Sequence, residues 1–302
     1  QQLSNVKAHL YKQILISLRL NPSHQNIRIQ IREQLDFATI LYNKGLYKQS
    51  LKILDKAKTL AISYEKKNIA YEIIELEKII ESQYITRSIS NRSDELTKQS
   101  KEVSEQNILL SKLSNLSLQL YGLFLKTGYV KNDKESKRVI KYFNARLPKY
   151  DINTLGFREK LWLYKAYLWY SFLTVDFLSC YKYATKWVDL FYENKDQIIL
   201  NPVFFLRGNH YLLEALFYLR HYEKFKESLL RFESITKEKW FPVDDNIDGL
   251  TFLYIYTNKF NLHFIEGSFK EGLPLVDEVL DRLKDYNDRI DEHHVMVFYY
   301  KI

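Results

Sequence analysis

Residues 37–61 read FATILYNKGLYKQSLKILDKAKTLA, and this stretch decides the fold. Apolar side chains recur on both sides of Gly45 at the spacing of one helix face. They are Phe37, Leu41 and Tyr42 before the glycine, and Tyr47, Leu51, Leu54 and Ala57 after it. Because glycine adopts the left-handed conformation at low cost, Gly45 is expected to end the first helix. The stretch therefore predicts two helices that fold back on one another.

The same corner recurs along the chain. It is clearest at Gly267, within FIEGSFKEGLPLVDEVL, and weaker copies stand at Gly128, Val175 and Arg220. The intervals between successive corners are 83, 47, 45 and 47 residues. One degenerate repeat is therefore expected within the first interval.

Helical periodicity extends over nearly the whole chain, and no segment alternates with the period of a strand. Eight glycines and five prolines among 302 residues are too few for the many turns of an all-β fold. The sequence therefore predicts an all-α protein. The expected helices are 4–20, 25–44, 47–64, 66–85, 92–105, 107–127, 134–147, 157–175, 177–194, 203–220, 222–236, 249–266, 270–286 and 290–302.

The helix pairs resemble the tetratricopeptide repeat (TPR) family, whose unit is about 34 residues long. The first copy carries the resemblance, with Phe37, Ala38, Leu41, Gly45, Tyr47, Leu51, Leu54 and Ala57 at the family's helix-packing positions. The resemblance extends loosely over residues 35–290, where the units are longer and Trp187, Phe225 and Phe232 replace small packing residues. The whole chain is also similar to uncharacterised bacterial proteins of this type, from which no activity can be carried over.

The resemblance implies a right-handed α-solenoid of antiparallel helix pairs, with about 13–14 helices in one continuous array over residues 1–302. Residues 1–85 would form the first helices, 86–107 a polar segment, and 108–302 the aromatic-rich repeats. The chain does not begin with methionine, and its last apolar helix at 290–302 has no partner helix. We therefore expect a fragment of a longer chain, or a second copy docked on that helix.

The polar segment 86–107 carries a sparse apolar stripe, with Ile89, Leu96, Val103 and Leu110 seven residues apart. Such a stripe is typical of a marginal, protruding helix or of a coiled-coil seam with another chain. A homodimer through the 86–110 stripe is therefore a second expected mode of self-association.

Charge and aromatic residues are unevenly distributed. Residues 1–150 contain 26 Lys and Arg against 14 Asp and Glu, and only 13 of the 46 aromatic residues. A basic half can attract nucleic acid, although a lysine-rich solvated face is the simpler interpretation. The most apolar window, within 161–181, contains Lys165 and Asp176, so no membrane span is expected. Together with the single cysteine, Cys180, this composition favours a cytoplasmic protein whose thiol is buried.

No pattern indicates catalysis, a cofactor or a metal site. DDNIDG at 244–249 matches the first half of a calcium loop, but Ile255 stands where the bidentate glutamate is needed, and Asn246 or Asp248 as a helix N-cap is simpler. His293 and His294 are adjacent and lack the i, i+4 spacing of a two-histidine metal face. Phosphate loops and nucleophile elbows are absent from the sequence. We therefore expect no enzyme.

In the resembled family, the first helix of each pair lines a concave groove. The corresponding positions here are Arg32, Leu35, Thr39, Tyr42 and Asn43; Trp162, Lys165, Trp169 and Phe172; Arg207, His210, Glu214, Phe217 and Tyr218; and Tyr254, Thr257, Asn258, Asn261 and Phe264. Ten of these are the candidate groove residues: Trp162, Lys165, Trp169, Arg207, His210, Glu214, Tyr218, Tyr254, Asn258 and Asn261.

Aromatic side chains beside a few fixed charges suit an extended peptide or a partner helix. Leu35 and Thr39 replace the Lys and Asn of the family's carboxylate clamp, although Lys165, Arg207 and Asn261 could together form an anion site. The expected function is a non-catalytic scaffold that binds a protein or peptide. Two alternatives remain: a peptide-sensing regulatory module with its effector domain elsewhere, and nucleic-acid binding by the basic half.

Overall fold

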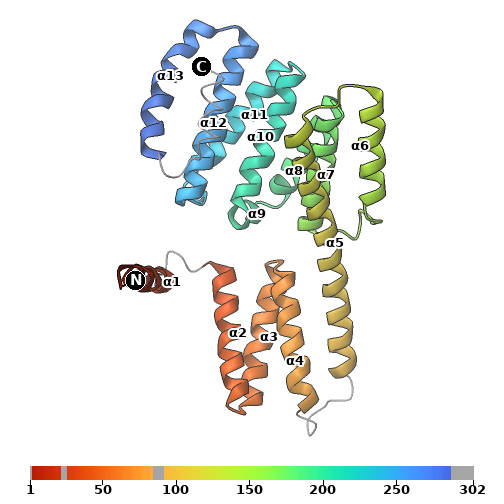
Figure 1. The fold of residues 1–302 in the computed structure, drawn as a ribbon, viewed down its shortest axis with the longest axis vertical. Coiled ribbons are helices and arrows are strands. Elements are labelled where there is room, and N and C mark those ends of the chain that lie inside the picture. The colour runs from red at the N-terminus through yellow and green to blue at the C-terminus, as the bar shows by residue number, and fades with distance from the viewer. Residues whose placement is uncertain (1, 22–25, 84–91, 287–302) are drawn as a thin grey trace. The chain divides into compact units, whose positions relative to one another are not determined.

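The computed structural model describes residues 2–21, 26–83 and 92–286, and within these ranges the protein is all-α, with no strand (Figure 1). The helices are α1 (Gln2–Leu20), α2 (Ile27–Asn43), α3 (Tyr47–Ser63), α4 (Lys67–Gln83), α5 (Arg92–Thr127), α6 (Asp133–Arg146), α7 (Phe157–Leu173), α8 (Phe177–Glu193), α9 (Asp196–Leu200), α10 (Pro202–Tyr218), α11 (Tyr222–Thr236), α12 (Asp245–Glu266) and α13 (Phe269–Leu283). A short 3₁₀ turn, Lys284–Tyr286, follows. The all-α prediction is confirmed.

The chain divides into two compact units, residues 1–111 and residues 112–302, and the boundary falls within α5. In unit 1, α2, α3 and α4 pack against one another. Their core is aliphatic, with Ile31, Leu54, Ile69, Ile73 and Ile80 fully buried. Every described side chain of α1 is exposed. Whether the chain forms one continuous array stays a prediction.

Unit 2 has a larger core that is rich in aromatic rings. Consecutive helices contact each other from α6 through α8 and from α10 through α13, and α8 also packs on α10. Trp187, Phe191, Phe205, Phe225 and Phe232 are its largest fully buried side chains. Cys180 is buried among them, as expected from the sequence, and burial raises the pKa of its thiol.

All five predicted corner residues adopt positive φ. Gly45, Gly128 and Gly267 have φ of 73°, 65° and 71°, and Val175 and Arg220 have φ of 61° and 52°. At Gly45 the next amide, that of Leu46, donates back to Leu41 O at 2.9 Å. This bond to a carbonyl five residues earlier closes the helix end and turns the chain. The structure adds a sixth corner, Glu65 with φ of 53°, within the long first interval.

Two helix predictions are wrong. Residues 92–127 form one helix, α5, where two were expected, because nothing between residues 105 and 107 breaks the helix. α12 begins at Asp245 and not at residue 249, because Asp244 is the N-cap: its Oδ1 accepts from Ile247 N at 2.8 Å. Asp248 instead accepts a hydrogen bond from the Tyr286 hydroxyl at 2.6 Å. The helix predicted at 290–302, with His293 and His294, lies outside the described residues.

The apolar stripe of the polar segment packs inside unit 1. Leu96 and Val103 belong to its buried core, so they are not available as an exposed seam. Leu110 is half-buried, and Ile89 lies outside the described residues. The seven-residue spacing therefore marks the side of α5 that packs against the core of unit 1.

Candidate functional site

A pocket of about 430 Å³ lies within unit 2 among α5, α7, α10 and α12. Six of the ten candidate groove residues line it together: Lys165, Trp169, Arg207, His210, Glu214 and Tyr254. Thr257, also at a predicted groove position, and Leu118, Tyr121, Tyr211 and Leu253 complete the wall. Its volume falls within the range of small-ligand sites.

Helical spacing explains why these side chains meet. Lys165 and Trp169 are four residues apart on α7, and Arg207, His210 and Glu214 follow at three and four residues on α10. Residues three or four apart lie on one face of a helix, so each helix presents one row to the pocket. Leu118 and Tyr121 of α5 also line the pocket. They lie between the corners at residues 45 and 128, where the sequence shows no recognisable repeat, so the sequence did not predict them.

Two cations face the pocket. Lys165 lies over the Trp162 ring, with Nζ 4.7 Å from the ring centroid, and among the described residues it forms no ion pair. Burial, and then the positive charge of Arg207, lower the pKa of Lys165 to about 8. Burial raises the pKa of the Tyr254 hydroxyl, and the positive charge of Arg207 beside it opposes that rise. Glu214 is the acidic residue of the lining.

Two buried polar atoms of the lining have no hydrogen-bond partner among the described residues: Trp169 Nε1 and Thr257 Oγ1. Trp169 is only 5% exposed and Thr257 only 2%. By contrast, the buried Trp187 donates its Nε1–H to Phe204 O at 3.1 Å. Both atoms have almost no accessible surface, so they lie within the wall and not on its open side.

Aromatic rings make the walls of the pocket rigid. The Trp169 ring centroid lies 4.7 Å from that of Tyr121 and 5.4 Å from that of Tyr211. The His210 ring stacks on Tyr254 at 4.5 Å with an interplanar angle of 14°. Rings held by other rings lose little freedom when a ligand binds, which favours affinity.

The structure puts the remaining candidates elsewhere. Trp162 packs against Phe204, with ring centroids 5.4 Å apart, and touches the site only through Lys165. Tyr218 stacks on Phe177 and hydrogen-bonds Tyr129, outside the pocket lining. Asn258 and Asn261 are fully buried, and the Asn258 amide donates to Tyr254 O. They lie on the same side of α12 as Tyr254 and Thr257, but they are covered by neighbouring side chains and do not line the pocket. Leu35, the clamp position of the first copy, is buried in unit 1.

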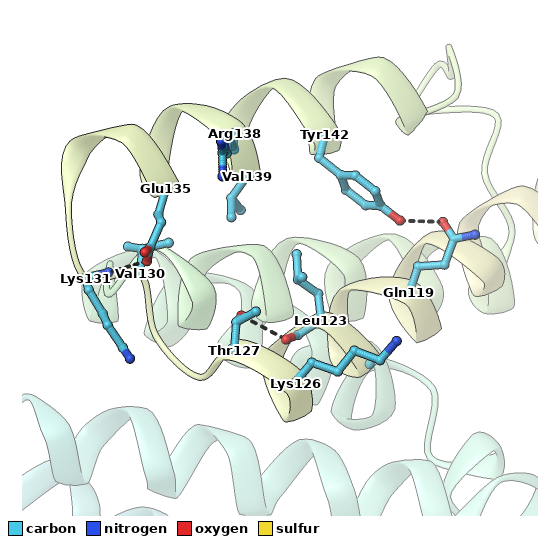
Figure 2. Close-up of a pocket in the computed structure, with 11 residues that line it drawn as sticks. Gln119, Leu123, Lys126, Thr127, Val130, Lys131, Glu135, Arg138, Val139 and Tyr142 are labelled. Carbon is cyan, nitrogen blue, oxygen red and sulfur yellow. Dashed lines mark hydrogen bonds between the residues drawn. The ribbon is translucent and has the colours of Figure 1, made fainter.

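A wider groove of about 830 Å³ lies between α5 and α6. Figure 2 shows Tyr142 of α6 reaching Gln119 of α5, and Glu135 bending back to the backbone of Lys131. The basic side chains at this groove, including Lys126 and Arg138, are exposed. None of its described lining side chains has a buried polar atom without a partner.

Within the described residues, no three His, Cys, Asp or Glu side chains are grouped to hold a metal ion. One described helix, α5, is long and apolar enough to cross a membrane by length and composition, and 22% of its most apolar part is buried. A single helix of this kind is weak evidence for a membrane span.

In comparisons with known proteins, no family model, no curated protein and no solved structure matches this chain.

Proposed function

We propose that this protein is a non-catalytic scaffold that binds a protein or peptide segment, with the aromatic pocket among α5, α7, α10 and α12 as its anchor point. The observation that carries the proposal is the convergence of six groove residues, taken from three separate helix pairs, on one pocket. Aromatic anchors that fill or form pockets contribute most of the affinity of peptide interfaces.

The proposed architecture is a TPR-like α-solenoid of antiparallel helix pairs. Three features support it: neighbouring helices pack in chain order within each unit, the corners share positive φ, and the candidate groove positions fall on the first helices of their pairs, α7, α10 and α12. A cytoplasmic location remains part of the proposal, and it rests on the sequence composition alone.

The test selects, from a display library of random peptides, those that bind the 302-residue chain. Recovered peptides are then measured by calorimetry against the double variant Lys165→Met with Arg207→Met and against the control Lys270→Met, which changes an exposed lysine of α13. Alanine at Trp169 is avoided, because removing this buried ring would open a cavity and weaken the fold.

We expect at least one peptide that binds the chain and the control equally and the double variant at least tenfold more weakly. If the recovered peptides bind all three proteins equally, their binding site is not this pocket. If the chain recovers no peptide but binds a random oligonucleotide, with an affinity that falls steeply with salt, nucleic-acid binding by the basic half replaces the proposal.

A further inference from the structure

The groove of about 830 Å³ between α5 and α6 has an apolar floor and shares no lining residue with the aromatic pocket. The floor consists of Gly122 and Leu123 of α5, Val130 of the connection between the helices, and Val139 of α6. In Figure 2, Leu123 and Val139 point toward each other across the groove. Among the described lining residues only Val139 is buried, so the groove is open to solvent.

Three cations form the rim of this groove, one from each element that frames it. Lys126 comes from α5, Lys131 from the connection and Arg138 from α6, and none of them forms an ion pair with a described carboxylate. The acidic residue of the lining, Glu135, is already engaged, because its carboxylate accepts from Lys131 N at 2.9 Å and from Asn132 Nδ2 at 3.2 Å. Asn132 Oδ1 in turn accepts from Glu135 N, so this negative charge belongs to a capping box at the start of α6. The rim therefore attracts a partner that carries negative charge.

Gly122 is an interior residue of α5, and the described part of the chain gives no steric reason for a glycine there. A Cβ at this position meets no atom within 4 Å. Glycine within a helix is destabilising relative to alanine. At Gly208 the chain itself supplies the reason, because a Cβ would lie 2.8 Å from Trp187 Nε1. Gly122 instead faces the open groove, where the absence of a side chain lets the backbone of a partner approach closely.

The chemistry of the floor favours a helix over an extended peptide. The floor side chains carry no hydrogen-bonding group, so an extended peptide lying on them would leave backbone N–H and C=O groups without partners from the protein. A helix satisfies these groups internally and needs only an apolar stripe. The lining runs from Gln119 to Thr127 of α5, about 12 Å along the helix axis, which is room for about two turns of a docked helix.

Nucleic acid fits the groove less well. An apolar floor offers no partner to phosphate groups, and bases bind open surfaces mainly by stacking on aromatic rings. The aromatic residue of the described lining is Tyr142, and the Arg146 guanidinium already covers one face of its ring, 3.8 Å from the centroid.

We infer that the groove between α5 and α6 binds an acidic amphipathic helix of a partner protein. The apolar stripe of that helix packs on the floor and comes closest at Gly122. Carboxylates beside the stripe pair with the three rim cations, Lys126, Lys131 and Arg138. This surface is separate from the aromatic pocket among α5, α7, α10 and α12, so the inference goes beyond the proposed function.

The experiment uses synthetic stapled helices of about 15 residues, or about 22 Å, with acetylated and amidated ends so that no terminal charge takes part. The first set has a stripe of leucine, isoleucine or valine at helical spacing, flanked by glutamate. The second set has the same stripes flanked by lysine. The third set has the composition of the first in scrambled order, which breaks the stripe. Fluorescence anisotropy measures the binding of each helix to the 302-residue chain.

The variants test the rim and the floor separately. Lys126→Glu with Arg138→Glu reverses charge at the rim, and Gly122→Leu fills the floor at a position where a Cβ meets no other atom. The control for the rim reversal, Lys137→Glu with Lys141→Glu, changes two exposed lysines of α6 that do not line the groove. Circular dichroism and urea unfolding verify that each variant is folded.

We expect at least one glutamate-flanked helix to bind the chain and the control variant with equal, micromolar affinity. The lysine-flanked and scrambled helices should bind roughly tenfold more weakly, and the rim reversal and Gly122→Leu should each weaken the glutamate-flanked helix by roughly tenfold or more. The rim reversal should also gain affinity for the lysine-flanked helices, a result that misfolding could not produce. Failure of every glutamate-flanked helix to bind, equal binding of the first two sets, or affinities unchanged in both variants would overturn the inference.

A second arm separates this surface from the aromatic pocket. Lys165→Met with Arg207→Met should leave the affinity for the glutamate-flanked helix unchanged, and peptides selected for the aromatic pocket should bind Gly122→Leu as tightly as the unchanged chain. Each of the two proposals can therefore fail without the other. If the glutamate-flanked helix loses affinity for the Lys165 and Arg207 variant instead, it binds the aromatic pocket and this inference is wrong.

Two further results would replace the inferred partner by another. If gel filtration shows that the chain alone dimerises and that Gly122→Leu restores the monomer, a second copy of this chain occupies the groove. If a random oligonucleotide binds more tightly than every glutamate-flanked helix and loses affinity with the rim reversal, the rim binds nucleic acid.

Discussion

The two units place charged side chains in different surroundings, buried in unit 1 and half-buried around the pocket of unit 2. In unit 1, Lys58 and Glu77 are both buried, and Lys58 Nζ lies 2.7 Å and 3.0 Å from the two carboxylate oxygens. Arg92 reaches the same carboxylate at 3.3 Å. In unit 2, Lys165 and Arg207 face a pocket without such a partner. The first arrangement pairs its charges within the protein, whereas the second does not pair its cations with a described carboxylate.

The two units also differ in the side chains that fill their cores. The buried core of the described part of unit 1 is aliphatic, whereas that of unit 2 is built on Trp and Phe rings. In unit 2, rings that meet edge to face or stacked form the walls of the pocket among α5, α7, α10 and α12. The following variants test whether the polar groups of that pocket serve binding and not stability.

The largest effect is expected in unit 1. Lys58→Met leaves the buried Glu77 carboxylate with Arg92 as its one basic partner among the described residues. Removing one member of a buried ion pair costs about 3–5 kcal/mol. Hydrogen exchange followed by mass spectrometry should show faster exchange in α3 and α4. Tryptophan fluorescence is not suitable here, because all four tryptophans lie in unit 2.

The control for this pair is the double variant Lys58→Met with Glu77→Met, which replaces both charges by apolar groups of similar length. Since buried ion pairs gain little over apolar packing, most of the lost protection should return. A double variant as unstable as Lys58→Met would mean that the methionine at position 58 itself disturbs the packing.

The next largest effect is expected at Gly208, whose backbone lies close to the Trp187 ring in the core of unit 2. A Cβ at Gly208 would lie 2.8 Å from Trp187 Nε1, so Gly208→Ala should cost unit 2 about 2 kcal/mol by overpacking. The matched control is Gly122→Ala in α5, where a Cβ meets no atom within 4 Å. That change should stabilise the helix by about 0.5–1 kcal/mol. Urea unfolding followed by tryptophan fluorescence measures both, and equal effects would contradict the packing argument.

The sequence predicted local structure better than it predicted the pocket. Helix ends follow from local rules, since a left-handed corner needs only its own neighbours, and Gly45 and Gly267 were found in this way. The N-cap of α12 was missed because Asp244, Asn246 and Asp248 are all good caps, and only backbone geometry chooses among them.

The pocket depends on tertiary packing, which one sequence specifies weakly. Helical spacing was enough to find Lys165 and Arg207 as members of one face. It was not enough to show that Tyr218 belongs to a stack with Phe177, or that Asn261 turns into the core. A shift of one residue around a helix rotates a side chain by about 100°, so groove and core cannot be separated without the neighbouring helix.

A smaller effect should appear at Lys165 in the absence of ligand. Lys165→Met removes a half-buried cation whose charged form is destabilised, so it should stabilise unit 2 at pH 7 by about 1–2 kcal/mol while it weakens binding of the selected peptides. A stabilised variant that has lost binding is the signature of a functional residue. Loss of both stability and binding would assign Lys165 to the fold.

The same variant makes a signed prediction about pH. With the pKa of Lys165 lowered from 10.5 to about 8, the unfolded chain binds more protons than the folded chain between these values, so the stability of the wild-type chain gains on that of the variant as pH rises. The advantage of the variant is therefore full below pH 8 and shrinks toward pH 10. The other groups around the pocket, Arg207, His210, Glu214, Tyr121, Tyr211 and Tyr254, are common to both proteins and cancel in the difference. A constant difference between pH 7 and pH 10 would contradict this assignment.

The smallest effects on stability are expected at two corners, one from each unit. Val175 is β-branched, has φ of 61° and is 44% exposed, so Val175→Gly relieves backbone strain and removes little burial. We expect unit 2 to gain about 1 kcal/mol in urea unfolding. Gly45→Ala introduces the opposite strain in unit 1 at φ of 73°, with space for the Cβ, and should cost about 1 kcal/mol by hydrogen exchange in α2 and α3. Opposite signs would show that both corners depend on the same backbone conformation. If Val175→Gly destabilised unit 2, the side chain and not the φ angle would hold that corner, and the two units would turn their chains by different means.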